Sequence, residues 1–309
     1  MMKILLTGGS GRLGRSAVSG LAEIGYEVVS VDRVALPAGQ LPAQVVQEAV
    51  DLTVQGEALR VISAHQPDAV IHLAAIAVPF SVPENVILET NCKLAFAVMS
   101  AATEAGVGRI ITASSPTVIG YGNPAGWLPE RLPLDEGCTP RPWHAYSLSK
   151  LLAEQTMQML AAANGDRIRY AAFRPCFVIS PEEWLGAPTQ QGHTLRERLA
   201  DPALSAPALF NYLDARDAAR FLAVLLEKMD DIPNAETFFV GAADALATAP
   251  LAELLPRFVP GTEQTAAALT GSAPAFSIAK AQQLLGWQPE RSWRTELAGC
   301  PDTLAAASA

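Results

Sequence analysis

The chain begins with a short apolar segment that leads into a glycine-rich turn. Residues 3–7 (KILLT) have the pattern typical of a strand buried on both faces. Residues 13–24 should form a helix that Gly25 ends, since glycine commonly terminates helices. A second apolar segment at residues 27–31 is followed by Asp32. The start of the chain is therefore predicted to form a β-α-β unit.

Strands and helices continue to alternate along the next part of the chain. We predict strands at residues 69–73, 109–113 and 169–173, and helices at residues 59–64, 86–105 and 146–163. Such regular alternation indicates an α/β fold with a parallel, doubly wound sheet.

The chain becomes less regular after Pro175. Residues 181–207 are rich in Pro, Gly and polar residues. The elements predicted beyond residue 175 are helices at residues 194–199, 214–228, 250–258 and 278–285, and a strand at residues 238–241. We expect a main domain over residues 1–175 and a smaller, irregular, mainly substrate-binding lobe over residues 176–309, with elements that return to the sheet near residues 209–241.

The glycine-rich turn has the features of a phosphate-binding loop. Residues 7–14 read TGGSGRLG, which places Gly8, Gly11 and Gly14 at G-x-x-G-x-x-G spacing. Glycine tolerates positive φ and lets backbone N–H groups approach a phosphate, and the helix N-terminus adds about half a positive charge. Glycine clusters also occur in ordinary turns, but this one joins a strand to a helix. We therefore expect a Rossmann-type domain whose turn holds the pyrophosphate of NAD.

Asp32 bears on the choice of cofactor. At the end of the second strand, its carboxylate would accept hydrogen bonds from the adenosine ribose hydroxyls and repel a 2′-phosphate, which favours NAD. Arg33 weakens this inference because guanidinium is the usual partner of a 2′-phosphate, so NADP stays the less favoured alternative. Asp32 could also be a simple turn residue at a strand end.

Composition narrows the class of protein. The 309 residues are 50% hydrophobic and carry a net charge of -9 without a run of like charges, which disfavours nucleic acid and anionic membranes as partners. The first strand begins almost at Met1 and no apolar stretch is long enough for a bilayer, so we expect a soluble cytoplasmic protein without a signal peptide. Widely spaced thiols predict neither disulfides nor a metal site: Cys92, Cys138, Cys176 and Cys300.

Candidate catalytic residues lie at the start of one predicted helix and directly after one predicted strand. Tyr146 and Lys150 form Y-x-x-x-K at the start of a helix, where residues i and i+4 lie on one face. Such a pair alone is more often a solvated face. Ser114 and Ser115, however, follow the strand at residues 109–113, at the sheet edge where ligands of open α/β sheets bind.

Taken together, these segments resemble the extended short-chain dehydrogenases/reductases of the NAD-dependent epimerase/dehydratase family. The similarity extends over nearly the whole chain in the family's order. The matching segments are TGGSGRLG (7–14), VDR (31–33), DL (51–52), HLAA (72–75), Asn91, ASSPTVIGYG (113–122), YSLSK (146–150), FRP (173–175), LDARDAARF (213–221) and LGWQP (285–289).

The resemblance implies a role for each matching residue. Tyr146 would be the acid/base, Lys150 would bind the nicotinamide ribose and lower the tyrosine pKa, and Ser115 would bind the reacting oxygen. Leu73 to Ala75 could also be strand end only, and Asn91 a polar helix residue. The implied cofactor residues are Gly8, Ser10, Gly11, Arg12, Leu13, Gly14, Asp32, Arg33, Asp51, Leu52, Leu73, Ala74, Ala75, Asn91, Ala113, Tyr146, Lys150 and Pro175.

The type of reaction is less constrained. Pro116 and Thr117 stand where dehydratases of the family have acidic residues, which disfavours dehydration. Nucleotide-sugar enzymes usually have an arginine for the diphosphate near the place occupied by Phe210 and Asn211. The segment ASSPTVIGYG is also similar to uronate dehydrogenases of the family. The sequence thus favours an NAD-dependent dehydrogenase of a small sugar, uronate or polyol.

Two other functions stay open, a nucleotide-sugar epimerase that uses NAD transiently and a sensor or scaffold that binds NAD without turnover. Helices 86–105 and 146–163 pair across a two-fold axis in relatives, which implies a homodimer. Arg174 could meet a polar end of the substrate or be a buried structural arginine. The candidate substrate-binding residues are Ala77, Ser115, Pro116, Thr117, His144, Tyr146 and Arg174.

Overall fold

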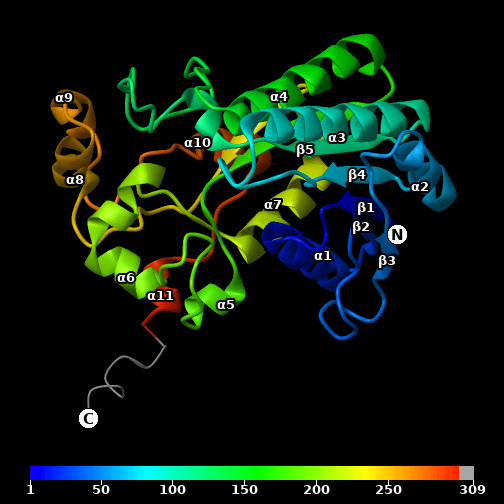
Figure 1. Ribbon diagram of the computed structural model, residues 1–309, viewed down its shortest axis with the longest axis horizontal. Coiled ribbons are helices and arrows are strands. Elements are labelled where there is room, and N and C mark those ends of the chain that lie inside the picture. The colour runs from blue at the N-terminus through cyan, green and yellow to red at the C-terminus, as the bar shows by residue number, and fades with distance from the viewer. Residues whose placement is uncertain (299–309) are drawn as a thin grey trace.

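A parallel sheet of seven strands forms the centre of the protein. The computed structural model describes residues 1–298 (Figure 1). The strand order is β3-β2-β1-β4-β5-β6-β9, and every neighbouring pair is parallel. The strands are β1 Lys3–Thr7, β2 Glu27–Asp32, β3 Val46–Ala49, β4 Ala69–His72, β5 Arg109–Ala113, β6 Arg169–Pro175 and β9 Glu236–Val240.

Helices cover both faces of this sheet. Helices α3 (Glu84–Glu104) and α4 (Ala145–Asn164) lie side by side on one face, with α2 (Glu57–His65) beside them (Figure 1). Helices α1 (Arg12–Ile24) and α7 (Ala215–Lys228) pack together on the other face. Each face has its own apolar cluster, so the strands are buried on both sides. This confirms the predicted doubly wound α/β fold.

The order in which successive strands are added to the sheet reverses at its centre. Strand β1 pairs with β2 on one side and with β4 on the other, and the crossovers on the two sides lie on opposite faces. At such a point the loops after the strands separate and leave a crevice at their carboxyl ends. The glycine turn after β1 and the loop after β4 border this crevice.

The segments after β6 build a less regular region that joins the sheet again. Strands β7 (Val178–Ile179) and β8 (Leu213–Asp214) form a small parallel sheet, while β9 returns to the main sheet beside β6. The domain division at residue 175 stays a prediction. The other helices are α5 Pro181–Trp184, α6 Leu195–Ala200, α8 Leu251–Phe258, α9 Glu263–Ala266, α10 Ala279–Leu285 and α11 Trp293–Glu296, with 3₁₀ turns η1 Pro116–Ile119, η2 Pro202–Leu204 and η3 Ala206–Ala208.

Most predicted elements are found within a few residues of their predicted bounds. Strand β3 escaped prediction because its sequence, VQEA, is polar and partly exposed at the edge of the sheet. Helix α3 is long and apolar enough to cross a membrane by length and composition only, and 44% of that stretch is buried within the protein, so this helix is weak evidence for a membrane span. Cys300 lies outside the described residues.

Candidate active site

The turn after β1 requires glycine at two positions. Gly8 has a φ of +79°, and a Cβ there would come within 2.6 Å of the backbone nitrogen of Ala74. A Cβ on Gly14 would lie 2.0 Å from the carbonyl oxygen of Gly8. No side chain caps the N-terminus of α1, so its first N–H groups face the crevice without a side-chain acceptor. These features fit a bound pyrophosphate.

Asp32 is held in place at the end of β2. One carboxylate oxygen accepts a hydrogen bond from the backbone nitrogen of Ser10 at 3.0 Å, and the other accepts one from the backbone nitrogen of Arg33 at 2.7 Å. The Ser10 hydroxyl donates to the carbonyl oxygen of Val34. Ser10 thus orients the Asp32 carboxylate through its backbone nitrogen. Ser10 was predicted to bind the cofactor, but it is not among the residues that line the crevice.

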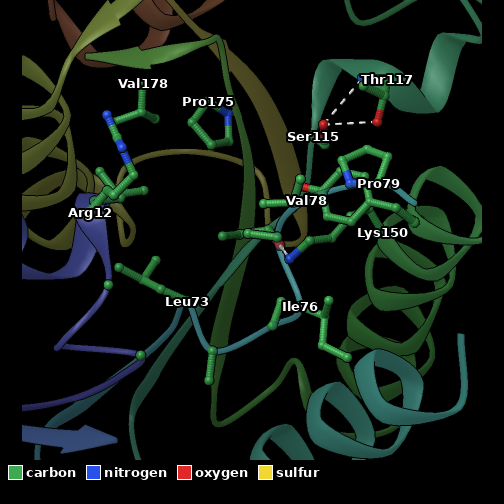
Figure 2. A pocket seen from close by; sticks show the side chains of 18 of the residues that line it. Arg12, Leu73, Ile76, Val78, Pro79, Ser115, Thr117, Lys150, Pro175 and Val178 are labelled. Carbon is green, nitrogen blue, oxygen red and sulfur yellow. Dashed lines mark hydrogen bonds between the residues drawn. The ribbon is translucent and has the colours of Figure 1, made fainter. Parts of the chain in front are cut away.

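A cavity of about 1240 Å³ connects this turn with the predicted catalytic residues. Figure 2 shows Arg12 at the left of the view, Ser115 and Thr117 at the upper right, and Lys150 at the right below them. This cavity brings together Gly8, Gly11, Arg12, Leu13, Gly14, Asp32, Arg33, Asp51, Leu52, Leu73, Ala74, Ala75, Ala77, Ala113, Ser115, Pro116, Thr117, His144, Tyr146, Lys150 and Pro175.

Helix α4 presents Tyr146 and Lys150 to the cavity from successive turns. The Lys150 ammonium donates to the carbonyl oxygen of Ala113 at 2.8 Å and lies 5.9 Å from the centre of the Tyr146 ring. Burial lowers the pKa of Lys150 to about 8. Burial raises the pKa of Tyr146, and the hydrogen bond with Ser115 opposes that increase.

Ser115 has a defined hydrogen-bond direction. It caps the 3₁₀ turn η1, and its Oγ accepts hydrogen bonds from the backbone nitrogen of Thr117 at 3.3 Å and from Thr117 Oγ1 at 2.9 Å (Figure 2). Because the Ser115 oxygen acts as acceptor in both contacts, its own proton is available as a donor. It can therefore donate toward the phenol of Tyr146 or toward a substrate oxygen.

His144 is fixed in one tautomer beside the catalytic tyrosine. Its Nδ1 accepts a hydrogen bond from the backbone nitrogen of Ser147 at 3.2 Å and so caps α4. The proton of the neutral ring is then on Nε2. The ring stacks on Tyr146, with centres 6.1 Å apart and an interplanar angle of 10°. Phe80 and Trp143 complete an aromatic wall of the cavity.

Arg174 does not point into the cavity, contrary to the prediction that it binds substrate. Its Nε and Nη2 donate to the two carboxylate oxygens of Glu154 at 2.7 and 2.8 Å, and its guanidinium lies 5.1 Å from the centre of the Phe239 ring. Both charged side chains are 5% exposed. Arg174 is therefore the buried structural arginine of the alternative interpretation.

Asn91 is likewise not a cavity residue, contrary to its prediction as a cofactor ligand. Its Oδ1 accepts a hydrogen bond from the backbone nitrogen of Ile76 at 2.7 Å, and its Nδ2 donates to the Ile76 carbonyl oxygen and to Ser149 Oγ. These three bonds occupy its amide. Asn91 therefore shapes the loop after β4 and ties it to α4.

Several cavity residues carried no signal in the sequence. They come from the loop after β4 and from the irregular segment after β6, where neither spacing nor pattern marks them. These residues include Phe80, Phe177, Val178, Gln190 and Gln191. A search for isolated polar residues within the Pro- and Gly-rich segment could have pointed to the two glutamines.

Comparisons with known proteins place the chain among enzymes of one family. The model of the NAD dependent epimerase/dehydratase family matches residues 4–241. The UDP-glucose 4-epimerase of Azospirillum brasilense is 30% identical over 173 residues, which are 53% of this chain and 46% of that protein. The chain thus spans about half the length of that relative. The UDP-glucose 4-epimerase of Corynebacterium glutamicum is 26% identical over 94% of this chain and 92% of its own length.

The fold has close counterparts among solved structures. The UDP-glucose 4-epimerase of Thermotoga maritima, solved with UDP-glucose, has a TM-score of 0.71, with 21% identity over 96% of both chains. At this identity the likeness is one of fold. The match of the family model over most of the chain goes further, and this chain belongs to the NAD dependent epimerase/dehydratase family.

Proposed function

We propose that this protein transfers a hydride between NAD and a hydroxyl carbon of a sugar-like substrate. The observation that carries this proposal is that Ser115, Tyr146 and Lys150 line the same cavity as the glycine turn. Two separate parts of the chain supply them: Ser115 lies in the turn after β5, and Tyr146 and Lys150 lie on successive turns of α4. A protein that only bound NAD would not need this set, which disfavours the sensor function.

The cavity residues fit NAD at its adenosine end. The turn at Gly8 to Gly14 and the N-terminus of α1 would hold the pyrophosphate, and Asp32 the adenosine ribose. Two of the three N–H donors of Lys150 remain after its bond to Ala113 and would bind the nicotinamide ribose. NAD, when bound, supplies the hydride acceptor.

The chain itself handles the proton. Tyr146 would take the proton of the substrate hydroxyl through its phenol oxygen, and the positive charge of Lys150 nearby would stabilise the phenolate. Ser115 would donate a hydrogen bond to the reacting oxygen as that oxygen becomes a carbonyl. The aromatic wall of Phe80, Trp143 and His144 would exclude water from this place.

The relatives favour one form of this reaction. Both curated relatives described above are named UDP-glucose 4-epimerase. This supports a nucleotide-sugar epimerase, in which the hydride returns to the opposite face of the same carbon, over the free-sugar dehydrogenase that the sequence favoured. We therefore take nucleotide-sugar epimerisation as the first candidate reaction.

One observation keeps the dehydrogenase as a second candidate. Among the described residues that line the cavity, the cations are Arg12 and Arg33 at the cofactor end and Lys150 at the catalytic centre. A diphosphate at the substrate end would have no cation in direct contact with it. Free sugars and uronates need no diphosphate partner.

A single pair of assays separates these candidates. Purified protein is incubated with NAD and UDP-glucose, and NMR detects any conversion into its 4-epimer. In parallel, NADH absorbance follows a hexose and a hexuronate. The epimer without net NADH supports the first candidate, and net NADH from a free sugar supports the second. Tight NAD binding with no turnover of any of these compounds would contradict the proposed hydride transfer.

We also propose a homodimer formed through α3 and α4. Each helix carries a large exposed apolar side chain, Phe96 at 54% and Met159 at 51% exposure. Light scattering coupled to size exclusion measures the mass directly, and a monomer would contradict the proposal.

A further inference from the structure

A buried arginine lies directly behind the wall of the cavity. Arg198, in α6, is 1% exposed. Its Nη1 donates a hydrogen bond to Gln191 Oε1 at 2.6 Å, and its guanidinium lies 4.7 Å from the centre of the Phe177 ring. Gln191 and Phe177 both line the cavity that contains Tyr146. One layer of side chains therefore separates this cation from the cavity.

The charge of Arg198 has no dedicated counterion. Within residues 1–298 no carboxylate forms an ion pair with it, and its Nε has no hydrogen-bond partner. The carboxylate that acts on it is that of Glu183, which is itself ion-paired with Arg12. Glu183 is thus already paired with the guanidinium of Arg12 and forms no ion pair with Arg198. Burying an uncompensated cation is costly, so its retention indicates an anion supplied from outside the chain.

Gln191 connects this charge to the cavity. An arginine can only donate, so the amide oxygen of Gln191 must face Arg198. The amide nitrogen is then the polar atom of Gln191 that is turned away from Arg198, and Gln191 is one of the residues that line the cavity. A cation bound to the amide oxygen also polarises the two N–H bonds, which makes them better donors to an anion.

We propose that Gln191 and Arg198 form a subsite for an anionic group of the substrate. The group is a phosphate or a carboxylate at the end of the substrate away from the reacting hydroxyl. The amide of Gln191 contacts it, and Arg198 acts as a positioning residue that supplies the charge. This inference rests on the proposed function and deepens it. It places the missing cation on α6 instead of near Phe210 and Asn211, where the sequence lacks it.

Calorimetry of the NAD-loaded protein tests the subsite. The probes are UDP-glucose, glucuronate and glucose, so that phosphate, carboxylate and neutral ends are compared. We expect one anionic probe to bind roughly tenfold or more tightly than glucose, as a charge-assisted hydrogen bond allows. A preference for UDP-glucose identifies a nucleotide sugar, and a preference for glucuronate identifies a uronate. Equal or weaker binding of both anionic probes would overturn the inference.

Variants assign the preference to these residues. Gln191→Leu and Arg198→Met should bring the affinity for the preferred anion down to that for glucose, and Arg198→Lys should restore part of it. Gln190→Leu is the matched control, since Gln190 also lines the cavity but makes no hydrogen bond to Arg198. It should keep the preference. If Arg198→Met does not fold, the comparison of the two glutamine variants still decides.

The proposed function and this subsite fail in different ways. Tyr146→Phe should lose turnover yet keep the preference for the anionic probe, because the phenol is not part of the subsite. A wild-type protein that transfers hydride but binds glucose as tightly as the anionic probes contradicts the subsite alone. An unchanged preference in both Gln191→Leu and Arg198→Met also contradicts it.

Discussion

The ammonium of Lys150 donates a hydrogen bond to the carbonyl oxygen of Ala113 at 2.8 Å. This bond ties the catalytic helix α4 to the end of β5. The turn that contains Ser115 comes directly after this strand. It also holds a charge that is almost fully buried, since Lys150 is 6% exposed. The lysine is thus placed for function at a cost in stability, and that cost depends on pH.

The first prediction concerns this pH dependence. Burial lowers the pKa of Lys150 from 10.5 to about 8. Between these values the unfolded chain holds more protons than the folded protein, so the lysine makes unfolding harder as pH rises. The gain is at most about 3.5 kcal/mol, from roughly 1.4 kcal/mol per unit of pKa. Below pH 8 both states are protonated and the full penalty remains.

Lys150→Met removes this penalty because the apolar side chain has no charge to desolvate. We expect the variant to have a higher Tm than the wild type at pH 7, with a difference that shrinks between about pH 8 and 10. Thermal unfolding of both proteins across this pH range measures the difference in Tm. Taking this difference cancels the contribution of the other titrating groups, which both proteins share. A variant less stable than the wild type at pH 7 would refute the argument.

The second prediction separates catalysis from cofactor binding. Tyr146→Phe should lower kcat by about 10²–10⁴-fold, as expected for loss of a general acid/base. The affinity for NAD should stay unchanged, because the ring and its stacking on His144 are retained. Tyr121→Phe is the matched control, since Tyr121 lines the same cavity but is not one of the proposed catalytic residues. Its kcat should change far less. Equal losses in both variants would exclude Tyr146 as the acid/base.

The sequence allowed prediction of those parts of the molecule that local patterns determine. Apolar runs identify β1 and β5, and helical spacing of apolar residues identifies α4, because buried positions recur along each element with the period of its secondary structure. The catalytic residues could also be predicted, since Tyr146 and Lys150 are linked by helix geometry and Ser115 by the end of a strand.

Side chains whose partners lie far away in sequence could not be assigned this way. Arg174 is paired with a carboxylate on α4, and Asn91 with the loop before α3, so each could be taken for a ligand. Both have polar groups that point inward, and only the fold reveals that another part of the chain satisfies them. Gln191 was missed, although it lines the cavity. Its neighbours in sequence form no repeating pattern that could have marked it.

A third prediction uses two glycines of the phosphate turn. Gly14→Ala places a Cβ 2.0 Å from the carbonyl oxygen of Gly8, whereas Gly11→Ala places one 3.2 Å from the same atom. Forced overpacking typically costs about 1–3 kcal/mol. Gly14→Ala should therefore unfold at lower urea concentration and lose NAD affinity, while Gly11→Ala should keep near-normal stability. Equal behaviour of the two variants in urea titrations would contradict this account of the turn.

The fourth prediction concerns Asp32. Its carboxylate would bind the adenosine ribose hydroxyls, so Asp32→Ser should weaken NAD binding by about 10–100-fold, the effect of losing a charged hydrogen-bond partner. The same change should improve NADP binding, since the repulsion of a 2′-phosphate is removed and Arg33 lies beside it. Fluorescence titrations with both cofactors measure the ratio. A ratio that stays constant would mean that Asp32 does not select the cofactor.

The last prediction assigns a structural role to Arg174. Removing one partner of a buried ion pair typically costs about 3–5 kcal/mol, because the other charge is left uncompensated. Arg174→Met and Glu154→Leu should each destabilise the protein by this order. The double variant should lose much less than the sum, since no charge is left alone, apart from the hydrogen bond of Ser114 to Glu154. Urea unfolding of all four proteins gives the coupling energy. Additive losses, or an Arg174→Met protein of normal stability with a raised KM, would restore Arg174 as a substrate ligand.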